Sequence, residues 1–129
     1  MGKFLTPLDV KVLGDRNFEV VNPLVFRSDD GNDYTVPVGQ TTDFASVWGI
    51  PLVSEVLSGK ANMAATLHDW CYRTGCVPRK KADELLWEAA LAEESNLNML
   101  EREFIANALY VGVREGGRSA YQGKPEWND

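Results

Sequence analysis

The chain has 129 residues, of which 44% are hydrophobic, enough to bury the core of one domain without help from disulfides or metal ions. Nineteen acidic residues against 13 basic ones give a formal net charge of −6, which disfavours nonspecific binding to nucleic acid or to an anionic membrane surface. The N-terminal segment lacks the apolar run of a signal peptide, and no stretch has the roughly 20 apolar residues that span a bilayer. We therefore expect a single domain over residues 1–129 that is made and kept in the cytoplasm unless another factor exports it.

Residues from about 8 to 40 alternate apolar and polar side chains, which is the pattern of antiparallel strands. Turn signals interrupt the alternation at Gly14-Asp15, at Asn22-Pro23 and over 29–33. The last of these is a favourable hairpin loop, because its Gly and Asn adopt positive φ angles at low cost. The segment predicts an antiparallel β-meander of about three to five strands.

Residues from about 45 to 117 change to helical spacing, with apolar side chains at steps of three and four. One predicted helix ends at Gly75, a second begins after Pro78, and a third begins at Asn98, where Glu101 completes a capping box. Residues 118–129 are expected to form an irregular tail. The side chains expected to face the core from the third helix are Leu100, Phe104, Ile105, Ala108 and Leu109. The predicted fold is therefore α+β, with the sheet packed against about three C-terminal helices.

The only histidine of the chain, His68, lies in the first predicted helix, beside Asp69 and one turn before Tyr72. Residues four apart share a helix face, so His68 and Tyr72 point the same way, while Asp69 projects about 100° away. An imidazole that activates water needs an acidic partner to fix its tautomer and raise its basicity. Asp83 is the candidate, because the short link after Gly75 lets its helix pack antiparallel to that of His68.

A third acid, Asp43, lies in the turn that joins the predicted sheet to the helices. Asp43 and Asp69 together could hold a hard divalent cation such as calcium through carboxylate and backbone oxygens. The other side chains expected to line such a site are Thr42, Ser46, Tyr72 and Arg73.

The His-Asp pair also has a purely structural interpretation. His68 can donate to a backbone carbonyl, and Asp69 can anchor the preceding turn through Thr42 or Ser46, or pair with Arg73. Polar side chains at a junction between sheet and helix often satisfy backbone groups there.

The remaining polar residues have simple structural alternatives as well. Asp43 can be a helix N-cap, and Asp83 can occupy the favourable first turn of its helix. Cys71 and Cys76 are interpreted as small core or turn residues, and one histidine with two cysteines disfavours a structural zinc site. The basic run 79–81 is interpreted as a solvated helix start.

Four motifs follow one another along the chain: Val36–Gly39, Thr42–Val47, Leu67–Arg73 and Arg79–Asp83. In this order they resemble the domain of unknown function 1353 family of tailed-phage and prophage proteins. The stretch 110–117 fits as well, so the resemblance covers nearly the whole chain. It implies a phage gene product, located in the host cytoplasm or in the assembled virion. The family name brings no activity with it.

A more local resemblance is to the active site of A2-type phospholipases, particularly the short phospholipase domains of parvovirus capsids. It rests on the spacing His-Asp-x-x-Tyr in one helix and an Ala-Asp pair in the next. The resemblance implies that His68 activates water, that Asp69 binds calcium and that Asp83 orients His68. The calcium loop of that family is rich in glycine, whereas only Gly39 occurs near the corresponding place here.

These observations give three hypotheses. The first is a phage-encoded hydrolase that acts on an ester of lipid or cell envelope, with His68 as general base. The second is a non-enzymatic virion, tail or assembly component whose exposed apolar side chains, Trp87 above all, dock on another phage protein. The third is a small phage protein that binds a host factor. The first requires Asp43, Asp69 and Asp83 to converge around the imidazole in a pocket that water can enter.

Overall fold

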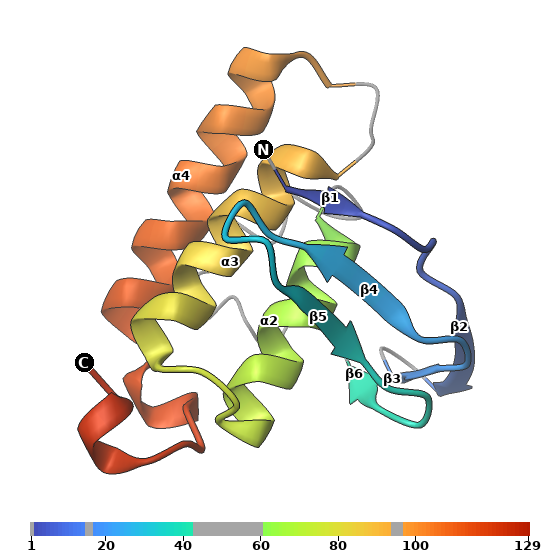
Figure 1. The fold of residues 1–129 in the computed structure, drawn as a ribbon, viewed down its shortest axis with the longest axis horizontal. Coiled ribbons are helices and arrows are strands. Elements are labelled where there is room, and N and C mark those ends of the chain that lie inside the picture. The colour runs from blue at the N-terminus through green and yellow to red at the C-terminus, as the bar shows by residue number, and fades with distance from the viewer. Residues whose placement is uncertain (1, 15–16, 43–60, 94–96) are drawn as a thin grey trace.

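The structure is a computed structural model that describes residues 2–14, 17–42, 61–93 and 97–129. Within these residues, six strands in two antiparallel sheets form the N-terminal half and three α-helices follow in the C-terminal half. The strands lie on one side of the molecule and the helices α3 and α4 on the other, with α2 alongside the strands (Figure 1). The predicted α+β fold is confirmed.

The strands divide between two small sheets. In the first sheet, β4 (Leu24–Arg27) pairs with β1 (Lys3–Phe4) and with β5 (Asp33–Val36). In the second, β3 (Asn17–Val20) pairs with β2 (Val10–Gly14) and with β6 (Thr41–Thr42). The strands β1 and β6 have two residues each, too few to show an alternation in the sequence.

The hairpin between β4 and β5 has the predicted turn chemistry. Gly31 adopts a φ of +86°, and the N–H of Ser28 donates to the carbonyl oxygen of Asn32 at 3.0 Å. Arg27 and Asp33, which face each other across the end of the hairpin, form an ion pair at 2.8 Å.

The helices are α2 (Asn62–Thr74), α3 (Arg79–Ala92) and α4 (Met99–Gly116). The ends of α2 and α4 follow the predicted signals, since Gly75 ends α2 in the left-handed conformation. At the start of α4, the side-chain oxygen of Asn98 accepts from the N–H of Glu101 at 2.9 Å. The side chain of Glu101 accepts in turn from the N–H of Asn98, which completes the capping box. No helix within the described ranges is long and apolar enough to cross a membrane.

The core lies between the strands and the helices, with α3 in contact with both α2 and α4. The large side chains of the core are Val20, Leu24, Phe26 and Val36 from the strands and Leu67, Leu85, Leu86 and Leu109 from the helices. Removing large apolar side chains of this kind from water stabilises a fold by roughly 1.5–3 kcal/mol each.

The buried stripe of α4 differs from the prediction. Leu100 and Phe104 were expected to face the core, but their side chains are 78% and 68% exposed. Ile105 and Leu109, which were also expected to face the core, are buried, and Val113 is buried with them. The helix has apolar side chains on more than one face, so periodicity alone did not identify the face that packs on α3.

The segment that follows α4, predicted as an irregular tail, is held against the helices by hydrogen bonds. It contains two short 3₁₀ helices, Arg118–Ala120 and Pro125–Trp127. Between them, the hydroxyl of Tyr121 donates to the carbonyl oxygen of Val77 at 2.6 Å. The N–H of Gln122 donates to the backbone carbonyl oxygen of Tyr72 at 2.9 Å. The segment therefore covers the turn that joins α2 to α3.

Candidate functional site

The carboxylate of Asp83, in the first turns of α3, is the centre of a buried polar cluster. Its Oδ1 lies 2.7 Å from Nε2 of His68 and 2.6 Å from the hydroxyl of Tyr72, both on α2. Its Oδ2 accepts from Nη1 of Arg114, on α4, at 2.8 Å. We call these residues, together with Arg79, the Asp83 cluster. It joins all three helices at one carboxylate.

The local sequence explains how α2 and α3 bring these groups together. His68 and Tyr72 are one turn apart, and their ring centroids lie 4.1 Å from each other. Because the left-handed Gly75 ends α2 sharply, α3 turns back along the same face. The predicted meeting of His68 with Asp83 is thus found in the structure.

Two arginines that were not predicted as site residues complete the cluster. Arg79 is only 2% exposed, and its Nη1 donates to the carbonyl oxygen of Val113 at 3.1 Å and lies 3.6 Å from Oδ2 of Asp83. The interpretation of 79–81 as solvated is therefore wrong for Arg79, whose four-residue spacing from Asp83 was the available signal. Arg114 also donates to the backbone oxygen of Asp129 at 2.6 Å.

The neighbours of Asp83 keep it ionised. Burial alone would raise the pKa of its carboxyl group, but hydrogen bonds from His68, Tyr72 and Arg114 outweigh that effect and lower the pKa below its ordinary value. Burial and the bond to Asp83 raise the pKa of Tyr72 well above its usual value, so Tyr72 remains a protonated donor. Because an ionised carboxylate can only accept, Nε2 of His68 carries the proton in their hydrogen bond.

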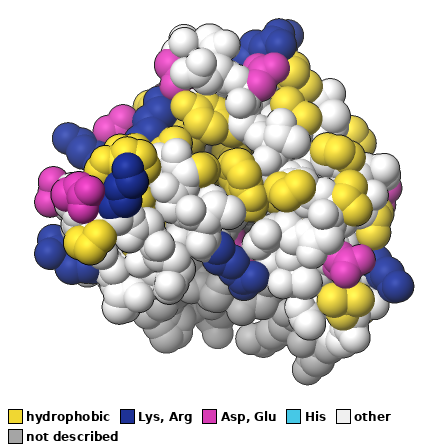
Figure 2. Space-filling view, turned by 60° about the horizontal axis from the view of Figure 1, so that its bottom comes forward, with side chains coloured by type: hydrophobic (Ala, Val, Ile, Leu, Met, Phe, Trp, Pro, Cys, Tyr) yellow, Lys and Arg dark blue, Asp and Glu magenta, His cyan; other side chains and the backbone are white. Residues whose placement is uncertain are grey.

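The two nitrogens of the imidazole have different surroundings. The residue is 1% exposed, and no histidine side chain is visible on the face shown in Figure 2. Nε2 is engaged with Asp83, whereas Nδ1 has no hydrogen-bond partner among the residues that the structure describes. Nδ1 is therefore the nitrogen that can accept a proton.

Of the three acids expected to converge around the imidazole, Asp83 is hydrogen-bonded to it, whereas Asp69 pairs with Arg73 and Asp43 lies outside the described residues. Asp69 forms an ion pair with Nε of Arg73 at 3.3 Å, and Nη1 of Arg73 donates to the hydroxyl of Thr41 at 3.2 Å. The pairing of Asp69 with Arg73 is the structural role that the sequence offered as an alternative to metal binding. Thr42 is buried on β6, opposite Phe18 on β3. Asp43 and Ser46 lie outside the residues that the structure describes.

The predicted cation site is not tested, because one of its two carboxylates, Asp43, falls outside the described ranges. Within those ranges, no group of three or more His, Cys, Asp or Glu side chains is placed to hold a metal ion.

A second buried carboxylate, Glu93 at the end of α3, caps the start of α2. Its Oε1 accepts from the N–H of Ala64 at 2.9 Å, and its Oε2 accepts from that of Met63 at 3.2 Å. Burial raises the pKa of Glu93 to about 7, although the backbone donors oppose the rise. The signal in the sequence was a carboxylate in line with the apolar stripe of α3.

The chain matches a known protein family. A family model described as protein of unknown function (DUF1353) matches residues 18–113, which is more than half of the chain and includes His68, Tyr72, Arg79 and Asp83. Neither the curated proteins nor the solved structures gave a match. The chain therefore belongs to the DUF1353 family.

Proposed function

We propose that this protein is a phage-encoded hydrolase that cleaves an ester of lipid or cell envelope, with His68 as general base and Asp83 as the group that orients it. The observation that supports this proposal is the asymmetry of the imidazole. Nε2 is fixed 2.7 Å from Asp83, while Nδ1 has no partner among the described residues. The phage origin rests on the sequence resemblance alone.

The proposed reaction uses His68 and Asp83 in two different roles. Nδ1 takes a proton from a water molecule as the water oxygen attacks the ester carbonyl carbon, and the imidazolium later returns the proton to the departing alkoxide. Asp83 accepts from Nε2–H throughout and stabilises the imidazolium. Arg114 and Arg79 share the negative charge of Asp83, so the main contribution of this carboxylate is to fix the ring in one orientation.

The imidazole is almost completely buried. A proton acceptor that is 1% exposed acts where bulk water is excluded, and charges that develop there interact more strongly than in solvent. The structural alternative for His68 was a bond to a backbone carbonyl, but the described partner of the ring is a carboxylate. Hydrolysis by water then requires that substrate and one water molecule reach the Nδ1 side of the ring.

The decisive variant is His68→Gln. Glutamine keeps an N–H donor near the position of Nε2 and lacks the base at Nδ1, so the bond to Asp83 is retained while the proposed chemistry is lost. Hydrolysis of phospholipid vesicles and of short acyl esters should fall by about 10²- to 10⁴-fold, the usual contribution of a general base. The control is Tyr72→Phe, which removes one donor to Asp83 and leaves the imidazole in place.

Wild-type turnover in a folded His68→Gln variant would show that His68 is not the base. Failure of the wild-type protein to release acid from any ester of the panel would reject the hydrolase itself. Parallel assays with calcium and with a chelator test the calcium role that the phospholipase resemblance implies for Asp69.

A second candidate function, that of a virion or assembly component, is favoured by a different surface. Leu100, Phe104 and Val111 are exposed and lie on one face of α4, because they are four and seven residues apart. Trp87 on α3 is also exposed, and its indole N–H donates to the side-chain oxygen of Asn107 on α4 at 2.8 Å.

Mass spectrometry of purified phage particles distinguishes this role from the first. A stoichiometric copy number that Phe104→Asp abolishes would support a structural component. Absence of the protein from the particle would reject it.

A further inference from the structure

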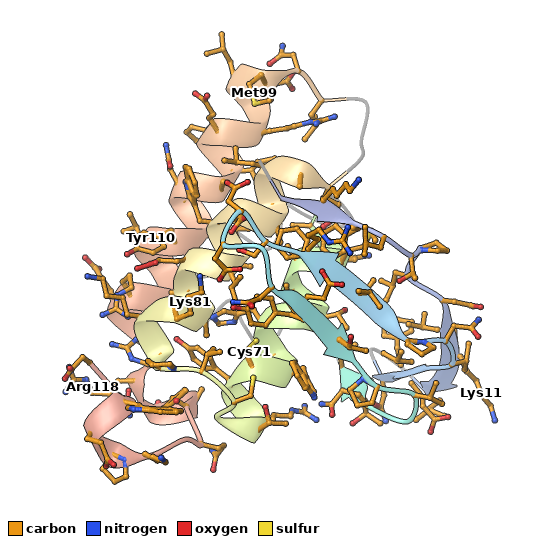
Figure 3. All side chains as sticks on the ribbon, in the orientation of Figure 1. Lys11, Cys71, Lys81, Met99, Tyr110 and Arg118 are labelled. Carbon is orange, nitrogen blue, oxygen red and sulfur yellow. The ribbon has the colours of Figure 1, made fainter. Side chains whose placement is uncertain are left out.

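Two cysteines meet where α2 ends. Gly75 adopts a φ of +62°, and its N–H donates to the carbonyl oxygen of Cys71 at 2.9 Å. In such a cap, the residue after the glycine commonly contacts the residue whose carbonyl is capped. Here those residues are Cys76 and Cys71, which lies near the end of α2 in Figure 3.

The two thiols are free and have opposite surroundings. Cys71 is buried and Cys76 is exposed. The neighbouring thiol of Cys71 lowers the pKa of Cys76 to about 6, although partial burial of Cys76 opposes the effect and Thr74 adds a smaller contribution. The same contact and burial raise the pKa of Cys71. An exposed sulfur held as a thiolate against a protonated thiol is the arrangement of a reactive pair.

We propose that Cys71 and Cys76 form a redox-active pair that a peroxide oxidises to an intramolecular disulfide. This inference goes beyond the hydrolase and does not depend on it. The cap brings the two residues to the same end of α2, and the exposure of Cys76 gives an oxidant access to its sulfur.

The chemistry proceeds in two balanced steps. The Cys76 thiolate attacks one oxygen of hydrogen peroxide, the O–O bond breaks, and hydroxide leaves, so that the sulfur is oxidised to a sulfenic acid and the peroxide is reduced. Cys71 loses its proton and attacks the sulfur of Cys76. The S–O bond then breaks, and the hydroxyl group leaves with a proton as water. Overall, two thiols and one peroxide give one disulfide and two waters.

The position of the pair gives the disulfide a structural consequence. Val77, directly after Cys76, accepts from the hydroxyl of Tyr121, and Tyr72, directly after Cys71, accepts at its carbonyl from the N–H of Gln122. Tyr72 is also a donor to Asp83. A disulfide would therefore tie the end of α2 to the turn that the C-terminal segment covers, next to the Asp83 cluster.

The test oxidises the full chain with stoichiometric hydrogen peroxide, then alkylates and measures the intact mass under denaturing, non-reducing conditions. The expected product is a monomer lighter by two hydrogens that does not react with iodoacetamide and is restored by dithiothreitol. Peptide mapping should find Cys71 linked to Cys76. Stable sulfinic or sulfonic acid on Cys76 with Cys71 still alkylatable, or a covalent dimer, would overturn the proposal.

A second measurement tests the contact in the reduced protein. The rate of alkylation of Cys76 should rise with pH around a midpoint near 6 in the wild-type chain. In Cys71→Ala the midpoint should move to higher pH, because the neighbouring thiol that lowers the pKa is lost. An unchanged midpoint would refute the pairing. The peroxide experiment uses the wild-type protein, so its outcome does not depend on whether the variant folds.

Discussion

Replacing Asp83 by Asn removes one buried charge and leaves the size of the side chain almost unchanged. The oxygen of the new amide can still accept from His68 and Tyr72, but its NH₂ group would face Arg114, which only donates. Arg79, at 2% exposure, would lose the carboxylate that lies 3.6 Å from its Nη1. The substitution therefore leaves a buried guanidinium without a counter-charge.

Removing one partner of a buried ion pair lowers the free energy of unfolding by about 3–5 kcal/mol. With a urea dependence of about 2 kcal/mol per molar, usual for a domain of this size, the midpoint of unfolding should fall by about 2 M. The pH dependence has a definite sign. Because the pKa of Asp83 is lowered in the folded state, its contribution is present above its ordinary value of 3.8 and is lost as the pH falls through the folded-state pKa.

Urea titrations followed by far-UV circular dichroism at pH 7 and at pH 3 measure both effects. The difference between wild type and Asp83→Asn should be large at pH 7 and smaller at pH 3. The matched control is Asp33→Asn, which breaks the exposed ion pair with Arg27 and should leave the midpoint unchanged within error. Equal midpoints for wild type and Asp83→Asn at pH 7 would refute the view that this carboxylate stabilises the three-helix junction.

Three further outcomes follow from the structure. Burial raises the pKa of Glu93 from 4.5 to about 7, so its contribution to stability is complete at a pH below the unfolded-state pKa and is lost as the pH rises through 7. The loss is roughly 3 kcal/mol at most. Glu93→Gln should lack this decline in urea midpoints between pH 5 and pH 8. Gly75→Ala should lower the thermal midpoint more than Gly31→Ala, because both need a positive φ but only at position 75 does an added Cβ meet the backbone of the C-terminal segment. Arg79→Met should lower the urea midpoint strongly and Lys80→Met hardly at all, since only Arg79 is buried; equal effects would contradict the proposed role of Arg79.

The contact between His68 and Asp83 could be predicted because it depends on two local features. Helical periodicity puts His68 and Tyr72 on one face, and a glycine stop followed by a short link returns the next helix along that face. Both features are visible in the sequence without knowledge of the rest of the fold.

The arginines of the Asp83 cluster could not be found in the same way. Arg114 reaches Asp83 from a helix 31 residues further along the chain, so the contact depends on where α4 crosses α3. That crossing follows from which apolar face of α4 is buried, and the sequence offered the face of Leu100 and Phe104 as readily as the face of Ile105 and Leu109. Arg79 was misread because a run of basic residues is usually solvated.

The state of the single imidazole can be measured directly by NMR, because the chain has only one histidine and its ring nitrogens give one set of signals. In protein labelled with ¹⁵N at histidine, the neutral form should carry its proton on Nε2, hydrogen-bonded to Asp83, and leave Nδ1 unprotonated. In Asp83→Asn this preference should weaken. A neutral ring protonated on Nδ1, or chemical shifts of an exposed, tautomer-averaged imidazole, would contradict both the cluster and the base that we assign to His68.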